Sequence, residues 1–203
     1  MKKQILHIDS SPSRESHSRK LSKTFVETLS KKYPEHKIVR RDLVLNPPPF
    51  VDQTWLDNAF LPLEKQDSEA MKIPNEIIYE FLDSEFVVVG MPMYNWGMPA
   101  VVKAWIDQIV RAGMTFSMTP NGIIGLTQPD KKVVGLISRN GRFLEGEPFE
   151  KANFQDNHFK GIMNFIGVQN VHVEVLQDVF NHADFQNIYN DAIERVKALA
   201  MKI

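Results

Sequence analysis

The sequence predicts an α/β fold in which five parallel strands form an open, doubly wound sheet with helices on both faces. Five short apolar runs alternate with amphipathic stretches of helical spacing, which is the pattern of βαβ units around a parallel sheet. The chain has 203 residues, a size typical of one α/β domain, so we expect residues 1–203 to form a single domain. In such a sheet the ligand crevice lies beyond the carboxyl ends of the strands.

The apolar runs give the positions of the strands. Several of them are rich in valine and isoleucine, as expected for strands that are buried on both faces. The run at 37–41 carries basic residues, which predicts a place at the edge of the sheet. The predicted strands span residues 4–8, 37–41, 86–90, 132–138 and 171–175.

Apolar residues spaced three and four apart predict five helices. The clearest pattern runs from Val102 to Val110, with Pro99 suited to the first turn and Gly113 suited to the stop. The helical pattern over 159–166 ends just before Gly167, and the pattern over 77–82 follows Pro74. The other four helices are marked by apolar residues over 21–29, 77–82, 159–166 and 185–196.

The segment between Leu43 and Ser68 does not fit either pattern. It is rich in proline and aromatic residues, including Pro47-Pro48-Pro49, and is too long for a plain connection. We interpret it as a functional flap or as a dimer-contact segment.

Composition excludes several classes of function. Lysine and arginine number 24 and aspartate and glutamate 25, so the net charge of −1 provides no field to attract nucleic acid or an anionic membrane. The absence of cysteine excludes disulfides, thiolate zinc sites and cysteine nucleophiles, so any redox chemistry must come from a cofactor. The six histidines lack zinc-site spacing, which predicts no metal site. With no signal peptide and no apolar stretch of about 18 residues, we expect a cytoplasmic protein.

The loop after the first strand is suited to binding an anion. Residues 9–19 contain five serines, two arginines and one histidine at the start of a predicted helix. Unpaired N–H groups, the positive end of the helix dipole and hydroxyl groups together bind phosphate well. The loop has neither a G-x-G-x-x-G nor a G-x-x-x-x-G-K-[ST] motif, which disfavours Rossmann dehydrogenases and P-loop NTPases. The alternative is that the serines only cap the helix and form turns.

Two further loops follow the third and fourth strands. Residues 90–99 combine Tyr94, Trp96, Asn95 and methionines, which suits the wall of a flat aromatic ligand, although the two aromatics are also explained by packing on the next helix. Residues 138–142 are polar and cationic, and the alternative there is an ordinary solvated loop. Together the three loops provide a phosphate cradle, an aromatic wall and a polar rim, the parts that an FMN site needs.

The segment after the clearest helix is a weaker candidate. Residues 115–118 followed by Asn121-Gly122 lie where they would cover a bound cofactor, and the alternative is that Asn121-Gly122 forms an ordinary turn.

Several motifs recur together in one known family. They are PMYNW at 92–96, RAGMTF at 111–116, Asn121-Gly122 with Gly125-Leu126, Ser138-Arg139 and NFIG at 164–167. In these motifs, and over nearly its whole length, the chain resembles the FMN-dependent NADH-azoreductases, a branch of the flavodoxin-like quinone reductases related to DT-diaphorase. The resemblance implies a flavodoxin-like sheet with strand order 2-1-3-4-5.

The resemblance also implies which residues bind FMN. Three positions depart from the family pattern: Asn140 replaces the first glycine of S-R-G-G, His17 stands where glutamine is usual, and Trp96 stands where phenylalanine is frequent. The implied phosphate-binding residues are Ser11, Ser16, His17 and Ser18. The implied ring-contacting residues are Met93, Tyr94, Asn95 and Trp96, and those beside the pyrimidine ring are Ser138, Arg139, Asn140 and Gly141.

The function implied by the resemblance is a ping-pong reduction of quinones and azo compounds. NADH or NADPH delivers hydride to the flavin and leaves, and a quinone or azo compound then takes two electrons. The protein is expected to be a homodimer in which the partner chain completes each crevice. No residue is implied to act as acid or nucleophile, and Asn95 is the best candidate for orienting the substrate. Arg40, Arg41 and Arg142 are candidates for contact with the 2′-phosphate of NADPH.

Two other functions stay open at this point. A flavodoxin-type FMN electron carrier without its own substrate is disfavoured by the net charge of −1, because such carriers are usually strongly acidic. In a flavin-free α/β binding protein, the aromatic residues and the serines would be purely structural.

Overall fold

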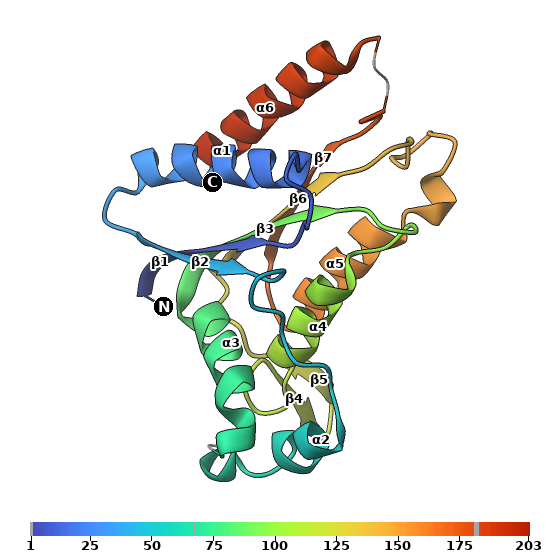
Figure 1. Cartoon of the computed structure of the whole chain (residues 1–203). Helices are drawn as coiled ribbons and strands as arrows, with labels where there is room; N and C mark the ends of the chain where they lie inside the picture. Colours follow the sequence, from blue (N-terminus) through green and yellow to red (C-terminus); the bar gives the residue numbers. More distant parts are fainter. Residues whose placement is uncertain (1, 67, 181–182) are drawn as a thin grey trace.

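The sheet at the centre of the molecule has five parallel strands. The computed structural model describes residues 2–66, 68–180 and 183–203 (Figure 1). The strand order is β2-β1-β3-β6-β7, with every neighbouring pair parallel. The order is that predicted for the five sheet strands, and β2 lies at the edge, as its basic residues predicted. The strands are β1 (Lys2–Asp9), β2 (Lys37–Asp42), β3 (Ser84–Pro92), β6 (Lys132–Ser138) and β7 (Asn170–Leu176).

Helices cover both faces of this sheet. On one face α1 (His17–Lys32) packs against α6 (Phe185–Lys202), and on the other lie α3 (Lys72–Asp83), α4 (Ala100–Ile109) and α5 (Phe154–Phe165) (Figure 1). Successive side chains of a strand point to opposite faces. In β3, Phe86 and Val88 belong to the α1/α6 core, whereas Val87 and Val89 belong to the other core. The strand is therefore apolar at consecutive positions from Phe86 to Val89.

All five predicted helices are present, but two boundaries differ from the predictions: α3 begins at Lys72, so Pro74 lies in its first turn and not before it, and α4 ends early. Pro99 precedes the first helical residue as predicted, but α4 ends at Ile109, so the predicted stop at Gly113 is wrong. The hydroxyl of Thr115 donates to the Ile109 carbonyl at 2.6 Å and accepts from the Arg111 backbone N–H at 3.0 Å. A side chain six residues beyond the helix thus closes its end.

The Pro-rich segment contains structure that the sequence did not predict. It forms α2 (Gln53–Ala59) and a 3₁₀ turn, Leu63–Lys65. The Trp55 indole N–H donates to Gln108 Oε1 at 2.7 Å, and Gln108 Nε2 donates to the Pro49 carbonyl at 2.8 Å. These bonds hold the segment against α4, and Figure 1 shows α2 away from the edge where β1, β3, β6 and β7 end.

A small hairpin was also missing from the predicted elements. β4 (Phe116–Thr119) and β5 (Gly122–Gly125) pair antiparallel in a sheet of their own, with Asn121 and Gly122 at the turn. Figure 1 shows the hairpin near α2, away from the edge where the parallel strands end. Asn121 lies in the turn of the hairpin, as the alternative interpretation predicted, and none of residues 115–125 lines the cavity described below. Among the described helices, none is long and apolar enough to cross a membrane.

Candidate functional site

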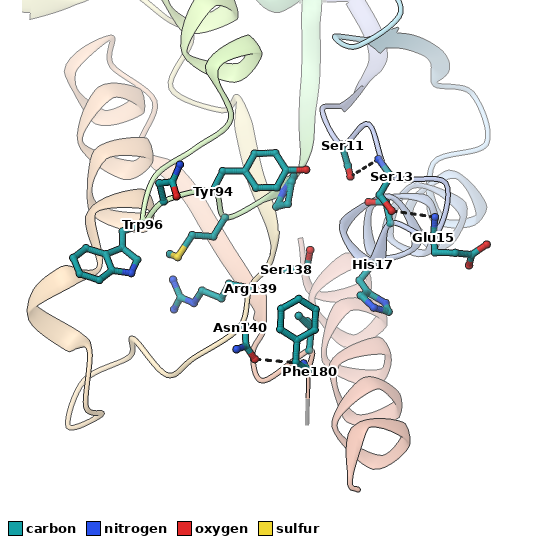
Figure 2. Close-up of a pocket in the computed structure, with 15 residues that line it drawn as sticks. Ser11, Ser13, Glu15, His17, Tyr94, Trp96, Ser138, Arg139, Asn140 and Phe180 are labelled. Atoms are coloured by element: carbon teal, nitrogen blue, oxygen red, sulfur yellow. Dashed lines mark hydrogen bonds between the residues drawn. The ribbon is translucent and has the colours of Figure 1, made fainter. Parts of the chain in front are cut away.

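Loops at the carboxyl ends of β1, β3, β6 and β7 surround one open cavity (Figure 2). Its volume is about 620 Å³, inside the range of about 300–1,000 Å³ usual for small-molecule sites. The lining residues are Ser11, Ser13, Glu15, Ser16, His17, Pro92, Met93, Tyr94, Asn95, Trp96, Ser138, Arg139, Asn140, Val179 and Phe180. The three loops singled out in the sequence therefore meet, as the geometry of a parallel sheet requires.

All but two of the predicted site residues line this cavity. Ser18 is fully buried behind the loop, with its hydroxyl 3.1 Å from that of Ser16. Gly141 follows Asn140 with a φ of +87° and is not among the lining residues. The side chain of Ser18 does not reach the cavity. Ser18 can contribute to ligand binding only through its backbone N–H, or indirectly through the hydrogen bond between its hydroxyl and that of Ser16.

The sequence analysis missed a fourth loop. Val179 and Phe180 follow β7 and close one side of the cavity, and the Phe180 backbone N–H donates to Asn140 Oδ1 at 3.3 Å (Figure 2). The rule that brought the other loops together also applies to this one. The loop itself carries no recognisable motif, so only its position after the last strand could have indicated it.

The serine-rich loop is folded by its own hydroxyl groups. Ser11 Oγ accepts from the Ser13 backbone N–H at 3.3 Å, and Ser13 Oγ accepts from the Glu15 N–H at 3.2 Å (Figure 2). Ser16 caps α1 by accepting from the Arg19 N–H at 3.2 Å. A hydroxyl that accepts a hydrogen bond keeps its own proton to donate. The loop thus has a fixed shape and still offers O–H donors.

The start of α1 adds backbone donors to the loop. The N–H groups of His17 and Ser18 belong to the first turn, where the helix itself provides no acceptor. The positive end of the helix dipole lies at the same place. Burial lowers the pKa of His17, aided by Lys20, so this imidazole is neutral near pH 7. The donors that the cradle offers to an anion are therefore hydroxyl and amide groups and not a charged imidazole.

The aromatic wall is a tight two-residue turn. The backbones of Tyr94 and Gly97 exchange two hydrogen bonds of 3.0 Å. Between them Asn95 and Trp96 have φ values of 48° and 65°, in the left-handed region that suits a type I′ turn but disfavours tryptophan. Gln155 Nε2 supports the turn from below by donating to the Pro92 carbonyl at 3.0 Å. Trp96 is 54% exposed and lines the cavity.

The loop after β6 is less cationic than its sequence suggested. The Arg139 side chain is buried, and its guanidinium donates to Asp156 Oδ1 at 2.9 Å and to Gln177 Oε1 at 3.0 Å. Arg142 pairs with Asp178 at 3.0 Å. Arg139 is therefore not the solvated arginine of the alternative interpretation: its charge is matched inside the protein, and the loop offers backbone groups and neutral side chains to the cavity.

The arginines considered for a 2′-phosphate are also engaged. Arg41 pairs with Glu76 and Glu80 on α3, and Arg40 donates to Asp9 at 3.0 Å. Neither of them lines the main cavity. Within residues 2–66, 68–180 and 183–203, no group of three histidine, aspartate or glutamate side chains is placed to hold a metal ion.

Comparison with known proteins identifies the family. The flavodoxin-like fold matches residues 3–200. An FMN-dependent NADH:quinone oxidoreductase of Nostoc sp. (strain PCC 7120) is 40% identical over 195 residues, covering 94% of this chain and 91% of the relative. This chain belongs to the flavodoxin-like family of FMN-dependent NADH:quinone oxidoreductases. The resemblance seen in the sequence motifs is thereby confirmed.

Solved structures agree with this family assignment. The azoreductase from Bacillus anthracis str. Sterne has a TM-score of 0.89 and 26% identity, with all of both chains covered. An FMN-dependent NADH-azoreductase from Bacillus anthracis str. Ames Ancestor, solved in complex with FMN, shares the fold at a TM-score of 0.81 and 22% identity, covering 97% of this chain and 99% of that one.

Proposed function

We propose that this protein is an FMN-dependent oxidoreductase that reduces quinones and azo compounds with NADH or NADPH. The observation that carries the proposal is the meeting of a serine-rich cradle, an aromatic wall and a polar loop around one cavity. The names of its flavodoxin-like relatives describe the same activities.

The residues present fit FMN. The cradle has O–H and N–H donors, and its carboxylate residue, Glu15, is exposed, points away from the cavity in Figure 2 and pairs with Lys20 at 3.1 Å. Such a donor set suits a phosphate dianion. The phosphate would be held by Ser11, Ser16, His17 and Ser18, and the ring by Met93, Tyr94, Asn95 and Trp96. The pyrimidine edge would meet Ser138, Asn140, Gly141 and the backbone of Arg139, whose side chain is committed elsewhere.

FMN, when bound, supplies the two-electron chemistry, accepting from NAD(P)H and donating to a quinone or azo compound in separate ping-pong half-reactions. The protein's task is to bind and orient. The half-exposed Trp96 indole gives a planar nicotinamide or acceptor a surface on which to stack. Asn95, held beside it in the turn, is placed to orient the substrate. Positioning of this kind supplies a large share of rate acceleration without an acid or nucleophile from the chain.

The proposal includes one FMN-binding domain over residues 1–203 with a doubly wound sheet. From β1 the chain moves outward to β2, and from β3 it moves outward in the opposite direction to β6 and β7. The direction reverses between β1 and β3, and ligands bind at such switch points. The serine-rich loop and the aromatic turn follow these two strands.

The proposal also includes a homodimer whose partner chain completes each site. The described residues of segment 43–68 (43–66 and 68) do not line the cavity of their own chain, which argues against a flap and favours the dimer-contact interpretation. Large apolar side chains of this segment and of the β4–β5 hairpin are more than half exposed, an unusual amount for a monomer. They include Leu45, Phe50, Phe60, Met118 and Ile123. Sedimentation equilibrium tests this point, and a monomer at micromolar concentration would contradict it.

The phosphate cradle is tested by comparing two flavins. Apo protein is titrated with FMN and with riboflavin, which lacks the phosphate, and binding is followed by quenching of flavin fluorescence. We expect Ser16→Ala, alone or with Ser18→Ala, to weaken FMN binding about tenfold and riboflavin binding little, because one charge-assisted hydrogen bond is lost. Ser30→Ala, at the far end of α1, is the matched control. Equal losses for both flavins would place the phosphate elsewhere.

The activity is tested by steady-state oxidation of NADH and NADPH with menadione or a diazo dye as acceptor. Turnover by the FMN-loaded protein is expected. A yellow protein without turnover would instead be an electron carrier. A colourless protein that gains no flavin absorbance from added FMN would contradict the proposal as a whole.

A further inference from the structure

Arg19 joins the two ends of the serine-rich loop from behind. Its Nε donates to the Ser11 carbonyl at 2.8 Å, and its backbone N–H donates to Ser16 Oγ at 3.2 Å. Arg19 lies in the first turn of α1 but is not among the residues that line the cavity. It therefore contacts the loop on the side opposite the proposed phosphate.

The guanidinium of Arg19 is fixed by two carboxylates on neighbouring strands. Nη1 and Nη2 donate to the two oxygens of Asp42 at 2.6 and 3.0 Å, and Nη1 lies 3.3 Å from Asp9 Oδ2. Asp9 and Asp42 end β1 and β2 and are partners in the register of the sheet. Asp42 also accepts from the Val44 backbone N–H at 3.0 Å. Arg19 is thus held on the rigid frame of the sheet.

The charges of this cluster persist over the physiological pH range. Burial raises the pKa of Asp9, but contacts with His7, Ser22 and Arg40 outweigh burial and lower the pKa to about 2. The hydrogen bond to Asp42 raises the pKa of Arg19. The ion pairs are therefore intact wherever the protein would work.

All three nitrogens of the Arg19 guanidinium have acceptors within the chain. Nε is taken by Ser11, and the two terminal nitrogens are taken by carboxylates. A guanidinium whose charge is matched by two carboxylates attracts a third anion weakly. Arg19 is thus poorly suited to be a direct ligand of phosphate, although it lies in the loop that the sequence marks for phosphate binding.

We propose that Arg19 is a positioning residue that keeps the phosphate cradle free of carbonyl oxygens. By holding the Ser11 carbonyl toward the Asp9–Asp42 side, it prevents this oxygen from turning into the cavity, where it would repel an anion. It also holds Ser11 and Ser16 at the separation that lets both hydroxyls donate to one ligand. This inference rests on the proposed function, because it assumes that the phosphate of FMN binds at the cradle.

The test uses Arg19→Gln and Arg19→Lys with the same pair of flavins. Neither glutamine nor lysine has a guanidinium group, so neither can donate to the Ser11 carbonyl and to both oxygens of Asp42 at the same time. We expect both to bind FMN at least tenfold more weakly while riboflavin affinity changes less than twofold. Arg41→Lys is the matched control, because it disturbs a buried arginine–carboxylate cluster on β2 outside the loop. It should lower the melting temperature without changing the ratio of FMN to riboflavin affinity.

The two arginine variants separate positioning from direct binding. If Arg19 contacted phosphate as a charge, Arg19→Lys would keep most of the affinity, and that result would overturn the inference. Unchanged FMN affinity in a folded Arg19→Gln protein, or equal weakening of both flavins, would overturn it too. Asp42→Asn gives the same test if Arg19→Gln does not fold. This variant keeps Arg19 but weakens its contacts with Asp42, and we expect it to lower the affinity for FMN about threefold without changing the affinity for riboflavin. If the wild type binds both flavins equally, the phosphate site of the proposed function has failed, whatever Arg19 does.

Discussion

The turn from Tyr94 to Gly97 holds a tryptophan in a backbone conformation that favours glycine. Trp96 has a φ of 65°, where a Cβ atom crowds the following carbonyl. We predict that Trp96→Gly is more stable than Trp96→Ala, the reverse of the usual order of these residues. Both variants lack the indole, so its packing cancels in the comparison and only the backbone effect is left.

The magnitude follows from two opposing effects. A Cβ atom in the left-handed region costs about 1–2 kcal/mol. Glycine loses about 0.5–1 kcal/mol more than alanine in conformational entropy on folding. The difference leaves Trp96→Gly about 0.5–1 kcal/mol more stable than Trp96→Ala. For a protein of about 150–250 residues this corresponds to a melting temperature about 1–4 °C higher.

The assay is thermal and urea unfolding of both variants, with a matched pair elsewhere in the chain. Glu27 is exposed in the interior of α1, and there the glycine variant should be about 1 kcal/mol less stable than the alanine variant. A Trp96→Gly protein that is less stable than Trp96→Ala would refute the reasoning about strain. Both position-96 variants should also bind FMN more weakly than the wild type and to a similar extent, because the wall has lost its indole in each.

Three further predictions concern residues in or next to the sheet, two beside the site and one at the opposite end of the strands. A Cβ at Gly90 would lie 2.8 Å from Ser22 Oγ, so Gly90→Ala should push α1 away from β3, cost about 1–3 kcal/mol in urea unfolding and weaken FMN more than riboflavin. The pKa of Asp9 falls from 3.8 to about 2 on folding, so the carboxylate contributes about 2 kcal/mol above pH 4 that is lost as the pH falls toward 2; Asp9→Asn should flatten this part of the stability curve. Burial lowers the pKa of Lys131 from 10.5 to about 8, so the folded protein loses a proton that the unfolded chain keeps between these values. Stability should rise with pH across that window by up to about 3 kcal/mol, and Lys131→Met should abolish the rise.

Local pattern predicted the sheet but not every element around it. The central strands are apolar at consecutive positions because both of their faces are buried, and this signal is readable in residues 86–89 alone. The end of α4 had no such signal. The hydrogen bond from the Thr115 hydroxyl to the Ile109 carbonyl closes the helix before Gly113, and this contact forms only in the folded chain. In α2 the Asp52 side chain caps the first turn, but a helix of 7 residues is too short to show a clear period.

The sequence by itself determined where the loops of the candidate site meet. Alternating strands and helices impose a parallel sheet, a parallel sheet brings its loops to one edge, and the residue types in those loops indicate a phosphate and a flat aromatic ring. Only the tertiary structure decided which of those residues have free donors. Arg19 and Arg139 are bound by Asp42 and Asp156, which are 23 and 17 residues away. Loop composition sets which charges are present, whereas the partner of each charge depends on strands and helices that meet only when the chain folds.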